Sequence, residues 1–204
     1  MFTGIVQGKA TIVKRVPDQD LVRLAVEFPS GSVDDVKRGA SIALNGVCLT
    51  VVTQQGNQID FDVMQTSLQL TSLGVCQEGD QVNFERAMRA ADEVGGHLLS
   101  GHVAAMGRIT KIETLGHGKM LHVEVPEPLR PYLFSKGYIG VDGASLTIVD
   151  VTANGFTISL IPETLDVTVL GGAAEGTPVN IEIDSQTRAV VDTVERVLAQ
   201  RLQS

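Results

Sequence analysis

The sequence predicts an all-β fold of two small barrels in tandem, related by internal duplication and followed by one C-terminal helix. The octapeptide Asn45–Val52 recurs 97 residues later as Asp142–Val149, and the same offset relates the residues on either side. Both copies consist of short segments rich in Val, Ile, Leu and Thr between turn residues, which is typical of small barrels. After the second copy the apolar spacing changes to that of a helix.

The duplication spans a whole domain. Residues 1–86 align with residues 98–183 without a gap, and 23 of these 86 positions are identical, where chance would give about five. The identities include Gly46 with Gly143 and Asn83 with Asn180. A repeat of this length is too long for a solenoid unit and indicates that a complete small domain was duplicated.

The first copy contains about six short strand segments separated by tight turns. Strands so short and numerous close most readily into a barrel. Each copy is also expected to contain one short helical turn, at Ser32–Arg38 and at Leu129–Ser135. The expected strands of the first copy are Gly8–Val16, Leu21–Phe28, Ser41–Leu44, Cys48–Gln54, Gln58–Val63 and Gln81–Glu85.

Composition changes mark the boundaries between the copies. The connection Ala87–His97 is rich in Ala and then in Gly, as expected of a linker. We therefore expect a first barrel over residues 1–89, a linker over 90–97, a second barrel over 98–184 and a helix over 185–204.

The C-terminal segment Ser185–Leu202 has no Gly or Pro, and its apolar residues recur at helical spacing. Such a stripe could fold back on its own barrel or pack against other subunits. We expect the intersubunit role, because Val and Leu at this spacing also suit a coiled-coil seam. The stripe consists of Val191, Val194, Leu198 and Leu202.

Charge and cysteine content limit the partners and the compartment. The net charge of -8 argues against general binding of nucleic acid or anionic membrane, which attract basic surfaces. No apolar run approaches the ~18 residues that a membrane-spanning helix needs. Cys48 and Cys76 occupy non-equivalent positions of one copy, so they are not a disulfide framework. The N-terminal sequence lacks a secretory signal, and we expect a cytoplasmic protein.

Cys48 and Ser145 occupy the same repeat position and are candidate nucleophiles, with His97 and His102 as candidate bases. The alternative is that Cys48 is a small buried side chain and Ser145 a turn hydroxyl. A metal site is not expected, because the five-residue spacing of the two histidines on a Gly-flanked segment is not the i, i+4 spacing of a helical zinc site, and no further ligands accompany them.

Polar residues gather where two equivalent strands end, at Asp62–Ser67 and at Ser159–Thr164. Hydroxyl, amide and backbone groups placed there would suit a polar heterocycle with a polyol tail. Ordinary strand-end turn chemistry is the alternative, and the residues alone do not decide between the two.

Seven motifs in matching order and spacing resemble the riboflavin synthase family of the alpha-chain type. The resemblance covers nearly the whole chain, including the tail segment Ala189–Arg196. The motifs are Met1–Val6, Asn45–Val51, Phe61–Met64, Val82–Ala87, Gly95–Val103, Asp142–Thr147 and Ile161–Leu165.

The resemblance implies six-stranded Greek-key barrels and a C-terminal helix that holds a homotrimer together. It also implies a reaction between two molecules of 6,7-dimethyl-8-ribityllumazine, in which one donates a four-carbon unit to the other. The products are riboflavin and 5-amino-6-ribitylaminouracil, and no cofactor is expected. Two identical substrates call for two similar pockets, which a duplicated barrel supplies.

By resemblance, the site lies between the first barrel of one subunit and the second barrel of a neighbour. The first pocket is expected to use Gly4, Ile5, Val6, Cys48, Leu49, Thr50, Asp62, Val63, Met64, Gln65, Thr66 and Ser67. The second is expected to use Gly101, His102, Val103, Ser145, Leu146, Thr147, Ser159, Leu160, Ile161, Pro162, Glu163 and Thr164, with Lys136 reaching across the interface. Cys48, His102 and Ser145 are the candidate catalytic residues.

The first copy departs from the family pattern. It has Thr66-Ser67-Leu68 where the family commonly has Glu-Thr-Leu, and Gln69 where a basic residue is frequent. Val167 stands where the second barrel often has Arg. These departures leave a second hypothesis, a non-catalytic relative like the lumazine or flavin proteins of luminous bacteria. The intact Gly95–Val103 and Ile161–Leu165 motifs favour the enzyme.

Overall fold

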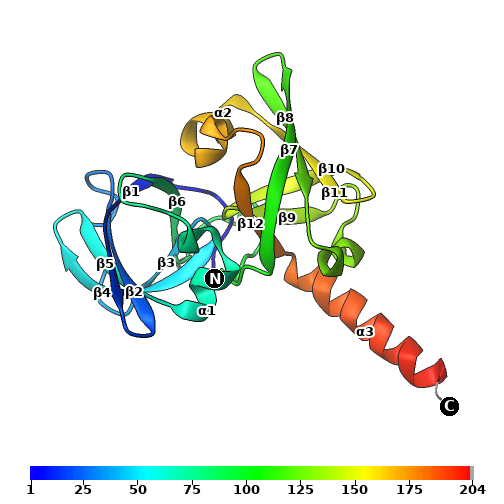
Figure 1. Cartoon of the computed structure of the whole chain (residues 1–204), viewed down its shortest axis with the longest axis horizontal. Helices are drawn as coiled ribbons and strands as arrows, with labels where there is room; N and C mark the ends of the chain where they lie inside the picture. Colours follow the sequence, from blue (N-terminus) through cyan, green and yellow to red (C-terminus); the bar gives the residue numbers. More distant parts are fainter. Residues whose placement is uncertain (203–204) are drawn as a thin grey trace.

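The computed structural model describes residues 1–202 as two closed antiparallel barrels with a long helix extending from the second (Figure 1). The first barrel closes in the order β1-β2-β5-β4-β3-β6. Its strands are β1 (Gly8–Asp18), β2 (Leu21–Glu27), β3 (Ser41–Leu44), β4 (Val47–Gln55), β5 (Gln58–Met64) and β6 (Gln81–Arg86). The all-β class and the six strands expected in the first copy are confirmed.

The second barrel repeats the first, with the equivalent strand order β7-β8-β11-β10-β9-β12. Most element boundaries shift by the sequence offset of 97 residues, which confirms the duplication. The strands are β7 (Ala105–Leu115), β8 (Gly118–Glu124), β9 (Tyr138–Val141), β10 (Ala144–Val151), β11 (Gly155–Leu160) and β12 (Pro178–Ile183).

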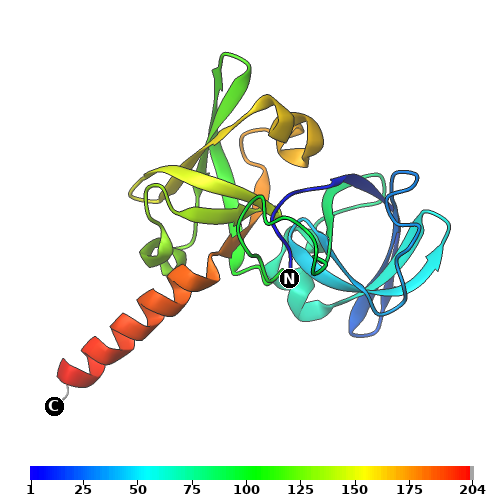
Figure 2. The same cartoon turned by 180° about the vertical axis from the view of Figure 1, so that it is seen from behind.

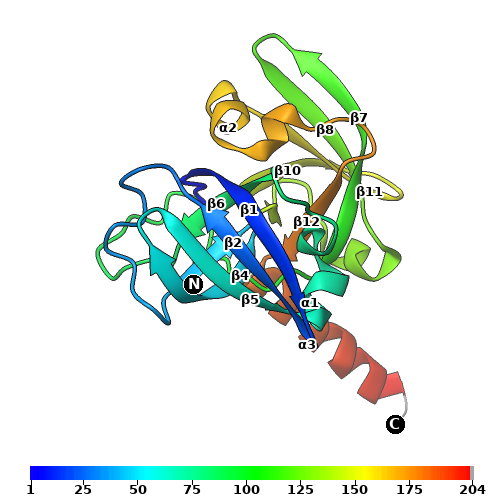
Figure 3. The same cartoon turned by 60° about the vertical axis from the view of Figure 1, so that its left-hand side comes forward.

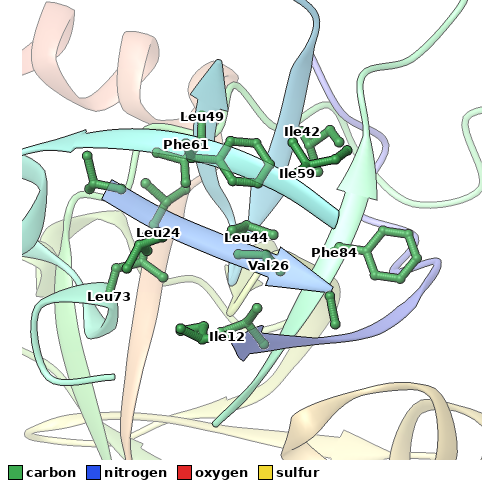
Figure 4. Packing of buried hydrophobic residues seen from close by; sticks show 14 of the residues in the cluster. Ile12, Leu24, Val26, Ile42, Leu44, Leu49, Ile59, Phe61, Leu73 and Phe84 are labelled. Atoms are coloured by element: carbon green, nitrogen blue, oxygen red, sulfur yellow. The ribbon is translucent and has the colours of Figure 1, made fainter. Parts of the chain in front are cut away.

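Each barrel encloses its own apolar core because alternate side chains of its strands point inward. In β5, Ile59, Phe61 and Val63 are fully buried, whereas the residues between them are partly exposed. Figure 4 shows Phe61 and Ile59 beside Leu44, Leu24 and other core residues of the first barrel. The second core is built in the same way around Phe156 and Ile158.

The recurring octapeptide begins in the β3–β4 and β9–β10 hairpin turns. Asn45 and Gly46 have φ angles of 45° and 78°, and Asp142 and Gly143 have 45° and 80°. Positive φ at both central residues identifies a type I′ turn, which favours Asn-Gly and Asp-Gly. The two turns touch, since a Cβ on Gly46 would lie 2.7 Å from the Gly143 backbone nitrogen. The repeated motif therefore forms the contact between the barrels.

Two equivalent asparagines cross this contact. Asn83 Nδ2 donates to the Asp142 carbonyl at 2.9 Å, and Asn180 Nδ2 donates to the Asn45 carbonyl at 2.8 Å. All four residues are buried. Buried polar groups are stable only when hydrogen-bonded, so this network fixes one arrangement of the two barrels.

The copies differ at the contact in one buried ionisable group. Asp142 stands where the first copy has Asn45. Burial raises the pKa of its carboxyl to about 7, although the backbone N–H of Asn180 donates to it. In the first copy the Asn45 amide donates to Ser72 Oγ, but the position equivalent to Ser72 is Val169. The second copy therefore holds a carboxyl that resists ionisation.

We expect Asp142 to make stability fall as pH rises. The folded protein retains a proton that the unfolded chain loses near pH 4, so the penalty is absent below that pH, grows up to about pH 7 and then stays constant. At about 1.4 kcal/mol per pKa unit the loss reaches up to about 4 kcal/mol. The free energy of unfolding should be measured with denaturant for the wild type and for Asp142→Asn/Val169→Ser, which recreates the first copy's pair. Between pH 4 and 7 the two proteins should differ in how steeply this free energy changes with pH. Equal slopes would contradict this prediction.

The N-terminal segments of the two copies are exchanged between the barrels. They pair at Phe2 and Leu99, each donating its backbone N–H to the other's carbonyl, at 2.8 and 3.0 Å. Beyond this pair, Val103 enters the core of the first barrel and Val6 packs against the core of the second. Figure 2 shows the N terminus between the two barrels. Each barrel is thus completed by a segment of the other copy.

Short helices follow the fifth strand of each copy, at α1 (Gln65–Leu70) and α2 (Pro162–Val167), where none was expected. The single turns η1 (Ser72–Gly74) and η3 (Val169–Gly172) follow them. The expected turn at Leu129–Ser135 corresponds in part to η2 (Glu127–Tyr132), but Ser32–Arg38 contains bends and turns without helix. Figure 3 shows α2 above β1 and β6, and Lys9 Nζ donates there to the Asp166 carbonyl at 2.9 Å.

The C-terminal helix α3 (Ser185–Leu202) begins directly after β12 and has no buried residue among those described. Tyr132 Oη donates to Asp192 Oδ1 at 2.5 Å, which ties the first half of the helix to η2. The remainder extends away from both barrels (Figure 1). No helix within residues 1–202 is long and apolar enough to span a membrane.

Candidate functional site

A cavity of about 250 Å³ lies at one end of the second barrel, between β10, α2 and the exchanged N-terminal segment. Its walls combine apolar side chains with hydroxyls and one carboxylate, the composition expected of a site for a polar heterocycle. The lining residues are Gly4, Ile5, Val6, Ala144, Ser145, Leu146, Ile161, Glu163, Thr164, Val167 and Thr168.

Gly4 brings the N-terminal segment into direct contact with β10. The Ser145 amide donates to the Gly4 carbonyl at 2.7 Å, and a Cβ on Gly4 would lie 2.5 Å from Ser145 Cβ. Gly4 also has a φ of 74°, a left-handed conformation that only glycine adopts at low cost. No other residue fits between the segment and the strand, so Gly4 sets one wall of the cavity.

A buried carboxylate holds this segment. Glu85 accepts hydrogen bonds from the Thr3 amide at 2.6 Å, from Thr3 Oγ1 at 2.8 Å and from the Gly4 amide at 3.0 Å. Burial raises the pKa of Glu85 above its usual value, although these donors favour the ionised form. Glu182 holds the equivalent segment of the second copy through Ser100 and the Gly101 amide, at 2.7 to 3.1 Å.

Ser145 is half-buried, and its hydroxyl contacts a histidine. The Ser145 Oγ lies 2.6 Å from His97 Nδ1. His97 is 7% exposed, and its ring stacks on Tyr138 with a centroid distance of 5.1 Å and an interplanar angle of 16°. Burial lowers the pKa of His97, although the nearby carboxylates of Asp184 and Glu182 oppose this shift. The imidazole is therefore neutral at pH 7.

The first barrel presents the equivalent arrangement around Cys48. The Cys48 amide donates to the Gly101 carbonyl at 2.9 Å, and a Cβ on Gly101 would lie 2.5 Å from Cys48 Cβ. The exposed side chains of His102 and Met64 take the places of Ile5 and Ile161. In the described part of the chain, the His102 ring has no hydrogen-bond partner, so it is free to meet a ligand.

The structure groups the expected site residues differently in one respect. Gly4, Ile5 and Val6 line the cavity of the second barrel, whereas Gly101, His102 and Val103 lie at the first. The reason is the exchange of N-terminal segments. Of the other residues expected in the second pocket, the cavity is lined by Ser145, Leu146, Ile161, Glu163 and Thr164, and not by Thr147, Ser159, Leu160 or Pro162.

Several expected site residues point into the cores instead. Leu49, Val63, Val103 and Leu160 are at least 90% buried, so they can offer a ligand little beyond backbone groups. Asp62 forms a two-pronged ion pair with Arg23 at 2.7 and 2.9 Å, which lowers the pKa of Asp62. The expected site residues with exposed side chains include Thr50, Gln65, Thr66, Thr147, Ser159 and Pro162, and Ser67 is half-buried on α1.

Sequence reasoning named His97 as a candidate base but placed it in neither expected pocket, and it omitted Ala144, Val167 and Thr168. In the structure Gly96 lets His97 approach Ser145, because a Cβ at residue 96 would lie 2.6 Å from Ser145 Cβ. Lys136 has a φ of 69° and an exposed side chain before β9, with no ion pair to another described residue. Its side chain is free to extend away from the second barrel.

Comparison with known proteins identifies the family. The model of the lumazine binding domain matches residues 3–87 and 100–184, one match for each barrel. Riboflavin synthase of Escherichia coli (strain K12) is 48% identical over 202 residues, covering 98% of this chain and 95% of the relative. The chain belongs to the riboflavin synthase family. Family members of this name from Chlamydia pneumoniae and Mycobacterium tuberculosis (strain CDC 1551 / Oshkosh) are 41% and 40% identical, and each comparison covers at least 97% of both chains.

Solved structures of LumP share the fold of this chain. LumP complexed with 6,7-dimethyl-8-(1'-D-ribityl) lumazine has a TM-score of 0.81 at 27% identity, covering 90% of this chain and 99% of LumP. LumP complexed with riboflavin has a TM-score of 0.84 at the same identity and coverage. The chain is thus closer in sequence to named riboflavin synthases than to LumP.

Proposed function

We propose that this chain is a riboflavin synthase. It binds two molecules of 6,7-dimethyl-8-ribityllumazine and transfers a four-carbon unit from one to the other. The products are riboflavin and 5-amino-6-ribitylaminouracil. Because one substrate molecule gains the carbons that the other loses, the reaction needs no external oxidant.

The observation that carries this proposal is the equivalence of Cys48 and Ser145. Each lies on a barrel strand against a glycine of the exchanged segment, which a buried glutamate holds in place. Two equivalent sites suit a reaction between two identical molecules. Full-length similarity to riboflavin synthases of several bacteria supports the same conclusion.

The chemistry requires mainly positioning. The C7 methyl group of the lumazine is acidic, because its carbanion is delocalised into the ring, so a modest base and exclusion of water suffice. We propose His102 as the group that moves this proton, since its ring is exposed beside the first pocket. Cys48 and Ser145 would lie near C7 of the two bound rings.

The test is to incubate the purified protein with 6,7-dimethyl-8-ribityllumazine, without added metal or cofactor, and to follow absorbance and chromatography. One riboflavin formed per two lumazines consumed, with the pyrimidine co-product, would establish the reaction. Tight binding with a shifted spectrum and no turnover would contradict it and favour a chromophore-binding protein. Thr66, Ser67 and Gln69 would then be the first residues to change.

We also propose that the complete site forms between subunits of a cytoplasmic homotrimer. The cavity of about 250 Å³ is smaller than the ~300–1,000 Å³ of typical ligand pockets, so a second barrel would have to close it. Three of the four stripe residues of α3 are exposed in the single chain, with Val194 at 51%, Leu198 at 55% and Leu202 at 87%. A projecting helix with such a stripe suits contact between subunits.

A charge in this stripe is expected to disperse the subunits. Val194→Glu should convert the trimer into a folded monomer and reduce turnover at least about tenfold, because a carboxylate is costly to bury in an apolar contact. Ala189→Glu, which adds the same charge about 140° away around the helix, is the matched control. Sedimentation and turnover should be measured together. A fully active monomeric Val194→Glu variant would contradict the shared site.

A further inference from the structure

The second pocket contains a buried pair of side chains, His97 and Ser145, that the proposed reaction does not yet use. The ring of His97 lies behind Ser145 and is held between the serine hydroxyl and the face of Tyr138. Ser145 separates the ring from the cavity that it lines. A histidine so placed acts on a ligand through Ser145.

The neutral imidazole of His97 carries one N–H proton, on either Nδ1 or Nε2. Burial keeps His97 neutral by lowering its pKa, and Nε2 is sealed from solvent with no hydrogen-bond partner among the described residues. A proton on Nε2 would leave a buried N–H without an acceptor, which proteins rarely tolerate. A proton on Nδ1 has a hydrogen-bond acceptor, because Ser145 Oγ lies 2.6 Å away.

We propose that His97 is a positioning residue whose Nδ1–H donates to Ser145 Oγ, so that the serine hydroxyl donates its own proton into the pocket. The ligand atom that Ser145 meets is then an acceptor, such as a carbonyl oxygen or ring nitrogen of the heterocycle. An imidazole that already carries its proton on Nδ1 cannot take the proton of Ser145. Ser145 is therefore a hydrogen-bond donor and not an activated nucleophile. This inference rests on the proposed function for the identity of the ligand.

The pair makes the two pockets chemically different. Cys48 occupies the place of Ser145, but no histidine hydrogen-bonds to its thiol in residues 1–202, and a thiol is a weak donor. The second pocket therefore fixes its ligand with a directed hydroxyl donor that the first pocket lacks. Although their backbones are equivalent, the two pockets would hold the same molecule with different hydrogen-bond partners.

Gly96 makes the arrangement possible. A Cβ at this position would lie 2.4 Å from the Thr3 carbonyl oxygen and 2.8 Å from Ser145 Oγ. Any larger residue would push the connection away from β10 and withdraw His97 from the serine. The Gly-rich end of the connection between the barrels thus positions a side chain of the site.

The tautomer can be measured directly in the wild-type protein. Long-range nitrogen–proton correlation spectra distinguish the two protonated ring nitrogens, and only four histidines need assignment. We expect Nδ1–H for His97 with or without riboflavin. An Nε2–H tautomer would overturn the proposal. Because this readout needs no turnover, it remains valid if the protein proves not to be an enzyme.

Binding of riboflavin to variants tests whether His97 acts through Ser145. His97→Leu removes the donor and should weaken riboflavin binding about tenfold, whereas His97→Asn supplies an amide donor near Nδ1 and should stay within about threefold of wild type. His97→Leu/Ser145→Ala should bind no more weakly than Ser145→Ala alone. Additive losses in the double variant, or unchanged binding by His97→Leu, would overturn the proposal.

Discussion

Gly46→Ala is expected to lower the free energy of unfolding by about 2–5 kcal/mol and to abolish most turnover. The new Cβ would lie 2.7 Å from the Gly143 backbone nitrogen and 3.0 Å from its Cα, in a turn that already requires positive φ. Neither of the two turns can move away without breaking the hydrogen bonds that Asn83 and Asn180 make across the contact. The strain would therefore separate the barrels and misplace β4 and β10, which carry Cys48 and Ser145.

Gly56→Ala is the matched control for this variant. Gly56 also adopts positive φ, at 61°, in a hairpin turn of the first barrel, but a Cβ at this position would meet no atom within 4 Å beyond its chain neighbours. Gly56→Ala should therefore lower the free energy of unfolding only by the cost of the left-handed conformation, about 1–2 kcal/mol. Denaturant unfolding and steady-state turnover should be measured on both variants. Equal losses in the two would show that contact between the turns contributes nothing.

Glu85→Ala and Glu182→Ala are expected to damage opposite pockets. Each change leaves two buried or partly buried backbone N–H groups without an acceptor, at a cost of about 3 kcal/mol. Loss of Glu85 releases Gly4 from the second pocket, and loss of Glu182 releases Gly101 from the first. Turnover should fall about a hundredfold in both variants, because misplacing one of two reacting molecules is sufficient. Glu78→Ala, which frees only an exposed amide, should have little effect.

The Cys48 thiol reports which pocket has opened. Gly101 covers Cys48, so alkylation of Cys48 should be faster in Glu182→Ala and unchanged in Glu85→Ala. Cys76 serves as an internal reference, since burial raises the pKa of its thiol to about 11 and keeps it unreactive. Equal acceleration in both variants would mean that the segments are not held independently.

Much of the fold could be predicted from the sequence because its signals are local. Asn45-Gly46 encodes a type I′ turn, alternation in β5 encodes a half-buried strand, and the offset of 97 residues transfers both to the second copy. The helices α1 and α2 could not be predicted in this way. They are six residues long and have no side-chain cap at their first turn, so packing against the barrels must stabilise them.

The exchange of segments could not be predicted for a different reason. In a duplicated chain, pairing Gly4 with the first barrel and pairing it with the second satisfy the same sequence pattern. Only the three-dimensional path of the chain distinguishes them. His97 was predicted only as a candidate base and was placed in neither pocket, because it lies one residue before the second copy and has no repeat partner within the sequence to mark it.

The exchanged segments also bear on how such a molecule could have arisen. If residues 98–103 were supplied by residues 1–6 of a second molecule, the same contacts would join two separate polypeptides as a swapped dimer. Joining the two genes would then preserve the interface while freeing each half to acquire its own side chains. Ser145 with His97 in one half, against Cys48 without a histidine in the other, is a difference that two halves encoded in one gene can keep.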